Sequence, residues 1–261
     1  MVTKNPRKLL RQFTKFIQKN SMNNPVETTE SDVLEGAKHP SHAKKLIGHK
    51  KPWQTFMKCQ KDNKIHHAWI ISGPKGIGKA TFSWKIAESL FHETLLPEKN
   101  AGLEKVKGLS ITNLFLCRRP FDEKTKKLKK FITVNEIRKL KSFFHLSAAE
   151  NEWRIALIDC ADELNKSASN ALLKILEEPP SKSIFLIITN RPARVSATIR
   201  SRCRSLNLNK LSIKEIEQVL EIASYDITSI SNRDWHVLSV IVEGSAGMAM
   251  KTINYKGVSI F

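Results

Sequence analysis

The sequence has no long apolar run and no closely spaced cysteines. No apolar stretch among its 261 residues approaches the ~20 residues that a membrane-spanning helix needs, which argues against a membrane protein. The four cysteines are far apart, at Cys59, Cys117, Cys160 and Cys203, so no C-x-x-C pair exists. We therefore predict no zinc knuckle and no bound metal. Scattered cysteines in a chain of this length are typical of a reducing compartment, and we expect a cytoplasmic protein.

Acidic residues are scarce. The chain has 25 Asp and Glu against 44 Lys and Arg, which gives a net charge of +19. This balance favours contact with nucleic acid or an acidic partner, or it reflects a generally lysine-rich proteome. A basic run from Arg118 to Lys130, broken by Asp122 and Glu123, has the same two interpretations: a solvated face or a contact with DNA phosphate.

Residues 1–21 contain no acid, and their apolar residues fall on one face of a possible helix. This pattern resembles a transit peptide or a membrane-surface helix. The alternative is that Met22 is the true start and the upstream residues are a loose tail. Residues 22–43 are polar. We expect residues 1–43 to form a flexible, basic and polar N-terminal extension.

The stretch from Trp153 to Cys203 predicts a strand, a helix and a second strand. Two β-branched apolar runs, Ile155–Ile158 and Ile184–Ile188, suit strands of a parallel sheet that are buried on both faces. Between them, residues 170–178 have helical apolar spacing and end at a pair of prolines. Asp159 closes the first run, so its carboxylate is expected at the sheet edge where α/β folds bind ligands.

A phosphate-binding loop precedes this stretch. After a short apolar strand at Ala68–Ser72, the motif G-x-x-x-x-G-K runs from Gly73 to Lys79 and opens a helix. The glycines, Gly73, Gly76 and Gly78, let backbone N–H groups approach phosphate oxygens, and the helix directs its positive end toward them. Lys79 would contact the outer phosphates.

The residue after that lysine breaks the motif. A P-loop needs Ser or Thr there to ligate Mg²⁺, and this chain has Ala80. Thr81 is one residue further, which on a helix is about 100° of rotation, so its hydroxyl should not reach the same place. Nucleotide binding is therefore expected to be weak or vestigial, and no cofactor is required.

The segment N-A-L-L-K-I-L-E-E-P-P at 170–180, followed by S-R-C at 201–203, resembles the clamp-loader subunits of bacterial DNA polymerase III. These are AAA+ proteins that open the sliding clamp and place it on primed DNA. The resemblance implies an α/β fold: a P-loop parallel sheet flanked by helices at 44–209, followed by a small α-helical lid domain at 210–261. Relatives continue into a helical collar domain, so we expect that domain to be absent here.

The resemblance also implies roles for single residues. Asn190 matches the sensor position at the tip of a strand, and Arg202 matches the arginine that reaches a neighbouring subunit's ATP. Cys160 stands where ATP-hydrolysing relatives carry a catalytic glutamate, and the last lid helix lacks their phosphate-binding arginine. The nucleotide-binding candidates, vestigial or active, are Gly73, Gly76, Gly78, Lys79, Thr81, Asp159 and Asn190.

These departures favour a subunit that resembles delta-prime, a non-hydrolysing stator. Its expected partners are the gamma/tau and delta subunits and, indirectly, the sliding clamp and primed DNA. One alternative is an active gamma/tau-like ATPase in which Thr81 and Asp162 replace the lost groups. Another is a truncated product that folds and does not assemble.

Overall fold

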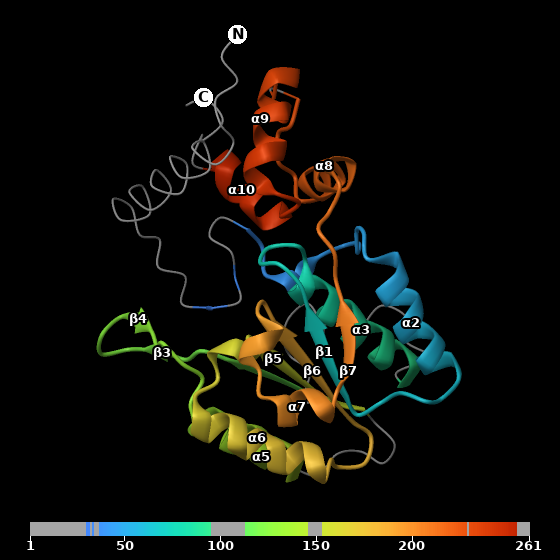
Figure 1. The fold of residues 1–261 in the computed structure, drawn as a ribbon, viewed down its shortest axis with the longest axis vertical. Helices are drawn as coiled ribbons and strands as arrows, with labels where there is room; N and C mark the ends of the chain where they lie inside the picture. The colour runs from blue at the N-terminus through green and yellow to red at the C-terminus, as the bar shows by residue number, and fades with distance from the viewer. Residues whose placement is uncertain are drawn as a thin grey trace.

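A computed structural model describes residues 30, 31, 33, 37–94, 113–145, 153–228 and 230–254. The possible basic helix within residues 1–21 and the alternative start at Met22 lie outside the described residues. The central element is a five-stranded sheet with the order β2-β5-β6-β1-β7, in which every pair of neighbours is parallel (Figure 1). Its strands are β1 (Ala68–Ser72), β2 (Leu114–Arg118), β5 (Arg154–Asp159), β6 (Ser183–Thr189) and β7 (Arg204–Asn207).

The apolar runs form the strands because both faces of the sheet are covered. All five residues of β1 and all seven of β6 are buried. Alternate residues face opposite sides: Ile70 and Ile187 pack into one core cluster, and Ile71 and Ile188 into the other. Continuous burial on two faces explains why these strands are apolar without alternation.

Helices cover the two faces as separate layers (Figure 1). One core cluster joins the sheet to α5 (Val134–His145), α6 (Lys166–Glu177) and α7 (Ala197–Ser201). The other joins it to α2 (Lys50–Lys61) and α3 (Lys79–Thr94). Short 3₁₀ helices occur at η1 (Pro40–His42), η2 (Ala161–Glu163) and η3 (Pro192–Arg194), and β3 (Phe121–Asp122) pairs with β4 (Lys127–Leu128) as an antiparallel hairpin.

The predicted α/β architecture is confirmed, and the start of one helix differs from the expected one. The helix expected from residue 170 begins at Lys166, because the Asn165 side chain caps it by accepting a hydrogen bond from the Ala168 N–H. The helix α2 begins at Lys50, after His49 adopts a left-handed conformation.

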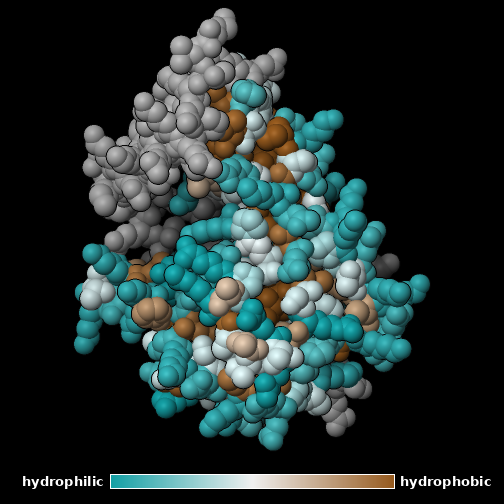
Figure 2. All heavy atoms as spheres, in the orientation of Figure 1, coloured by the Kyte–Doolittle hydropathy of each residue, from teal (hydrophilic) through white to brown (hydrophobic). Residues whose placement is uncertain are grey.

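In the described residues after the sheet there are three helices: α8 (Ile213–Ile222), α9 (Asn232–Val242) and α10 (Ala246–Asn254). They have a small core of their own, built around Ile216, Leu220, Leu238 and Val242. A capping box at Ser212 and Glu215 starts α8. In the view of Figure 2, hydrophobic side chains gather over these helices.

None of the described helices is both long enough and apolar enough to cross a membrane. Within the same described ranges, no three His, Cys, Asp or Glu side chains are grouped as metal ligands would be. The expectation of no metal stays a prediction.

Candidate functional site

The P-loop follows β1 at the carboxyl edge of the sheet and leads into α3. Gly76 has φ +80°, a backbone conformation that side chains disfavour, and Gly73 lies against the Leu208 carbonyl, which a Cβ would approach to 2.5 Å. The His49 ring supports the loop from the side, with Nε2 at 2.8 Å from the Ile77 carbonyl oxygen. A carbonyl oxygen can only accept, so His49 Nε2 donates this hydrogen bond. Burial lowers the pKa of His49 from its ordinary value.

Lys79 turns back onto its own loop. Its Nζ donates hydrogen bonds to the carbonyl oxygens of Gly73, at 2.8 Å, and Pro74, at 2.5 Å. The side chain is only 5% exposed. Burial lowers its pKa to about 8, and the carboxylates of Asp159 and Asp162 oppose that shift only in part. The Lys79 ammonium held in this way donates its hydrogen bonds to backbone carbonyls instead of extending outward.

The loop does not supply a complete site for a magnesium nucleotide. Ala80 has no oxygen to offer a metal and contributes its side chain to the core beneath the sheet. Thr81, the next hydroxyl, is half-buried one position further along α3. Asp159 ends β5 as predicted. Mg²⁺ favours oxygen ligands in octahedral geometry, and a P-loop without its hydroxyl does not fit the ion.

A polar network links the tips of β5 and β6. The Asp162 carboxylate oxygen Oδ1 accepts hydrogen bonds from Cys160 Sγ at 2.6 Å, Thr189 Oγ1 at 2.9 Å and the Asn190 N–H at 3.0 Å. Asn190 Nδ2 also lies 3.2 Å from Cys160 Sγ. Thus Asn190, the predicted sensor, lies beside Cys160, and both are fixed by Asp162.

The electrostatics of this network disfavour catalysis by its acids and thiol. Burial raises the pKa of Cys160 far above its usual range, so the thiol stays protonated. Burial alone would raise the pKa of Asp162, but its three hydrogen-bond donors outweigh burial, and the pKa lies below its ordinary value. A carboxylate with a lowered pKa and three donors is a poor proton acceptor for an attacking water.

The start of α10 lies directly on the P-loop. The Gly247 N–H donates to the Gly76 carbonyl oxygen at 2.8 Å, and a Cβ on Gly76 would come within 2.3 Å of Ser245 Oγ. A Cβ on Gly247 would lie 3.1 Å from the Gly76 Cα, so the two backbones are in close contact. This contact places the C-terminal helices against the part of the loop that would approach a phosphate.

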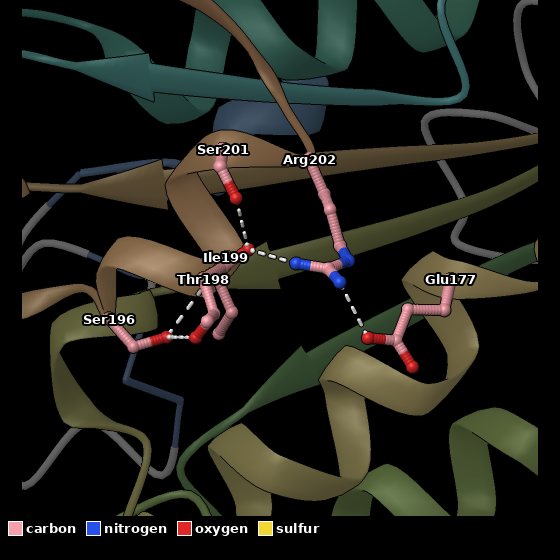
Figure 3. A network of polar contacts seen from close by, with 6 residues as sticks. All are labelled: Glu177, Ser196, Thr198, Ile199, Ser201 and Arg202. Atoms are coloured by element: carbon pink, nitrogen blue, oxygen red, sulfur yellow. Dashed lines mark hydrogen bonds and ion pairs between the residues drawn. The ribbon is translucent and has the colours of Figure 1, made fainter.

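Arg202 caps the end of α7, and its side chain is held within this chain. Its Nη2 forms an ion pair with Glu177 Oε1 at 2.7 Å, and Nη1 donates to the Thr198 carbonyl oxygen at 3.2 Å (Figure 3). Glu177 comes from the last turn of α6. The Arg202 side chain is 36% exposed and is turned toward α6.

The structure groups most of the predicted site residues and separates Arg202 from them. The P-loop, Asp159 and Asn190 lie at one edge of the sheet, whereas Arg202 belongs to the α6–α7 side. Sequence reasoning missed the Glu177 partner and the Gly76–Gly247 contact. The polar residues at the end of β6 and directly after it, Thr189 and Asn190, were the signal in the sequence for a partner at Asp162.

Comparison with known proteins shows what this arrangement is similar to. The family model described as "DNA polymerase III, delta subunit" matches residues 48–212. The chain is 34% identical over 187 residues to the DNA polymerase III subunit gamma of Buchnera aphidicola, a match that spans 70% of this chain and 49% of that protein. It is 30% identical over 154 residues to the delta' subunit of Pseudomonas aeruginosa, spanning 58% and 46%. The chain thus spans about half the length of these curated relatives.

Among solved structures, a RuvB variant of Thermotoga maritima superposes with a TM-score of 0.52 at 18% identity, covering 80% of this chain and 61% of that one. At this identity the likeness concerns the fold, and it agrees with a P-loop sheet followed by helices. The family model covers more than half of the chain, and the related subunits share its sequence. The chain therefore belongs to the family of DNA polymerase III clamp-loader subunits.

Proposed function

We propose that this protein is a delta-prime-like stator of the clamp loader, which does not hydrolyse ATP and supplies Arg202 to the ATP site of a neighbouring gamma/tau subunit. The observation that carries the proposal is the thiol at Cys160. It directly follows Asp159, and the nearest replacement carboxylate, Asp162, is occupied by three donors. The chain therefore retains the edge of the sheet where a nucleotide would bind. The residues at that edge are not suited to activate a water molecule.

An active gamma/tau-like ATPase is not favoured by any contact in this site. That alternative needs Thr81 to reach the metal and Asp162 to act as a base. Thr81 follows Ala80 on α3, and Asp162 is committed to the tips of β5 and β6. Any nucleotide binding is accordingly weak or vestigial. We infer a P-loop domain at 44–209 with a lid at 210–261, working in the cytoplasm with gamma/tau and delta, and indirectly with the sliding clamp and primed DNA.

To act on a neighbouring subunit, Arg202 must leave the Glu177 carboxylate and bind a phosphate of that subunit's ATP. In the isolated chain its guanidinium is paired with the Glu177 carboxylate, and both groups are partly exposed. Exposed ion pairs contribute about 0–1 kcal/mol, so a triphosphate on a neighbour can replace Glu177. Arginine suits the exchange because its fork binds either a carboxylate or phosphate oxygens. An arginine supplied in trans can accelerate phosphoryl transfer on the order of 10³-fold at the site it serves.

The test is the ATPase of a loader reconstituted with gamma/tau, delta, clamp and primed DNA. The purified chain alone should show negligible turnover. Arg202→Ala should incorporate normally and lower the stimulated ATPase, and Arg202→Lys should restore little of it. Arg200→Ala is the matched control, because Arg200 is an exposed arginine of the same helix. Glu177→Gln should preserve the activity or raise it a few-fold, with Glu178→Gln as its control.

Three results would overturn the proposal. Turnover near one per second by the chain alone, lost in Lys79→Ala, would identify an active ATPase. An unchanged rate in an assembled Arg202→Ala loader would mean that Arg202 only pairs with Glu177. Failure of the wild-type chain to bind gamma/tau and delta in a pull-down would instead favour a protein that folds without assembling.

A further inference from the structure

The β3–β4 hairpin projects from the edge of the sheet beside β2 (Figure 1). The segment from Arg118 to Phe131 has seven basic residues and two acidic ones. Five of the basic residues are lysines of the hairpin and of the stretch that returns from it: Lys124, Lys126, Lys127, Lys129 and Lys130, all exposed. A dense basic surface of this kind attracts polyanions.

The acids of the hairpin are used locally. Asp122 Oδ1 accepts hydrogen bonds from the backbone N–H groups of Lys124, at 3.0 Å, and Thr125, at 3.2 Å, which holds the turn. Glu123 pairs with Lys126 at 3.0 Å in a fully solvated position. The other four lysines, at 124, 127, 129 and 130, form no ion pair with any carboxylate of the described residues.

An aromatic ring is exposed among these lysines. Phe131 is 43% exposed, which is unusual for a large apolar side chain in this structure, and Lys130 Nζ lies 5.4 Å from its ring centroid. The next residue, Ile132, is completely buried and pairs with Leu164. Hydrogen bonds from Ile132 N to Glu163 O, at 2.9 Å, and from Asn165 N to Ile132 O, at 3.1 Å, fix this end of the hairpin.

We propose that the hairpin, residues 121–131, binds single-stranded nucleic acid without sequence preference, the lysines contacting phosphates and Phe131 stacking with a base. Lysines beside an exposed ring provide both interactions that single strands use. An acidic protein surface would pair with the lysines, but it would give the exposed Phe131 ring no function. The base of the hairpin is also tied to η2 by the ion pair of Arg119 with Glu163, at 2.8 Å. A bound strand therefore has a fixed position relative to the sheet. This binding is independent of the trans role of Arg202.

The experiment measures fluorescence anisotropy of a labelled 20-nucleotide oligothymidylate with the full chain over a range of salt concentrations. An oligouridylate, a 20-base-pair duplex and polyglutamate are separate arms, which distinguish DNA from RNA, single strand from duplex, and nucleic acid from acidic protein. One variant changes the four unpaired lysines to Gln, and the other is Phe131→Ala. The charge-matched control changes four exposed lysines of α2 to Gln: Lys50, Lys51, Lys58 and Lys61.

The four-lysine variant should reduce the slope of log affinity against log salt by about 3, because each phosphate contact to a single strand contributes about 0.7. Phe131→Ala should weaken oligothymidylate binding roughly ten-fold, as loss of one stacked base does, and Phe131→Tyr should restore it. If the α2 control lost as much affinity as the hairpin variant, binding would depend on net charge alone, and the proposal would be overturned. Equal binding to polyglutamate or duplex, with no effect of Phe131→Ala, would overturn it too.

Discussion

At the residue scale, Lys79 carries a buried positive charge that has no role in the isolated chain. Its Nζ reaches only backbone carbonyls, and burial lowers its pKa from 10.5 to about 8. Lys79 therefore binds its proton more tightly in the unfolded chain than in the folded one. The charged form costs the folded state about 3 kcal/mol below pH 8, and the cost disappears as the pH rises from about 8 to 10.5.

Lys79→Met should consequently raise the melting temperature at pH 7, and the difference from the wild type should shrink as the pH approaches 10.5. Thermal unfolding of both proteins at several pH values measures this difference directly. Lys75→Met is the control, because Lys75 is an exposed lysine of the same loop and should change little at any pH. A variant that is less stable at pH 7, or a difference that does not depend on pH, would show that the charge is solvated.

At the element scale, α10 is held on the P-loop by two glycines. The Gly247 N–H donates to the Gly76 carbonyl at 2.8 Å, and a Cβ on Gly247 would lie 3.1 Å from the Gly76 Cα. The core that α8, α9 and α10 share beneath this contact is small compared with the two cores that flank the sheet. Its attachment therefore depends on close backbone approach as well as on apolar packing.

We expect hydrogen exchange to be faster in residues 210–254 than in the sheet, and Gly247→Val to accelerate it further in α8–α10 while leaving β1, β5 and β6 protected. Met248→Val is the matched control, because it adds the same β-branched side chain to the same helix at an exposed position. Equal protection of lid and sheet in the wild type, or no effect of Gly247→Val, would mean that the two parts open together.

The elements that follow from the sequence are those set by local pattern. β1 and β6 were predictable because a strand buried on both faces must be apolar throughout, and the P-loop because its glycines are spaced for one backbone path. The Arg202–Glu177 ion pair was not predictable, since it joins α7 to the last turn of α6 across 25 positions of the chain. The contact of Gly247 with Gly76 likewise depends on how the lid docks. Spacing along one strand or helix carries no information about either contact.

At the scale of the whole molecule, a ligand that binds only the folded state raises its melting temperature. The stabilisation equals RT ln(1 + [L]/Kd), about 2.7 kcal/mol at a ligand concentration of 100 Kd. For a protein of this size, that corresponds to a shift of roughly 5–10 °C. The missing hydroxyl at Ala80, the retracted Lys79 and the docked α10 all weaken the site. We therefore expect 1 mM magnesium ATP to shift the melting temperature by less than about 1 °C.

The control for this measurement is Lys79→Met, whose melting temperature should respond to magnesium ATP no differently from that of the wild type. A shift of several degrees in the wild type that Lys79→Met abolishes would show a functional nucleotide site and contradict a vestigial one. Such binding without turnover would still be compatible with a stator, because the thiol at Cys160 and the Asp162 carboxylate, which accepts three hydrogen bonds at Oδ1, would still be unsuited to activate water. The melting experiment therefore tests nucleotide binding, and the ATPase of the reconstituted loader tests catalysis.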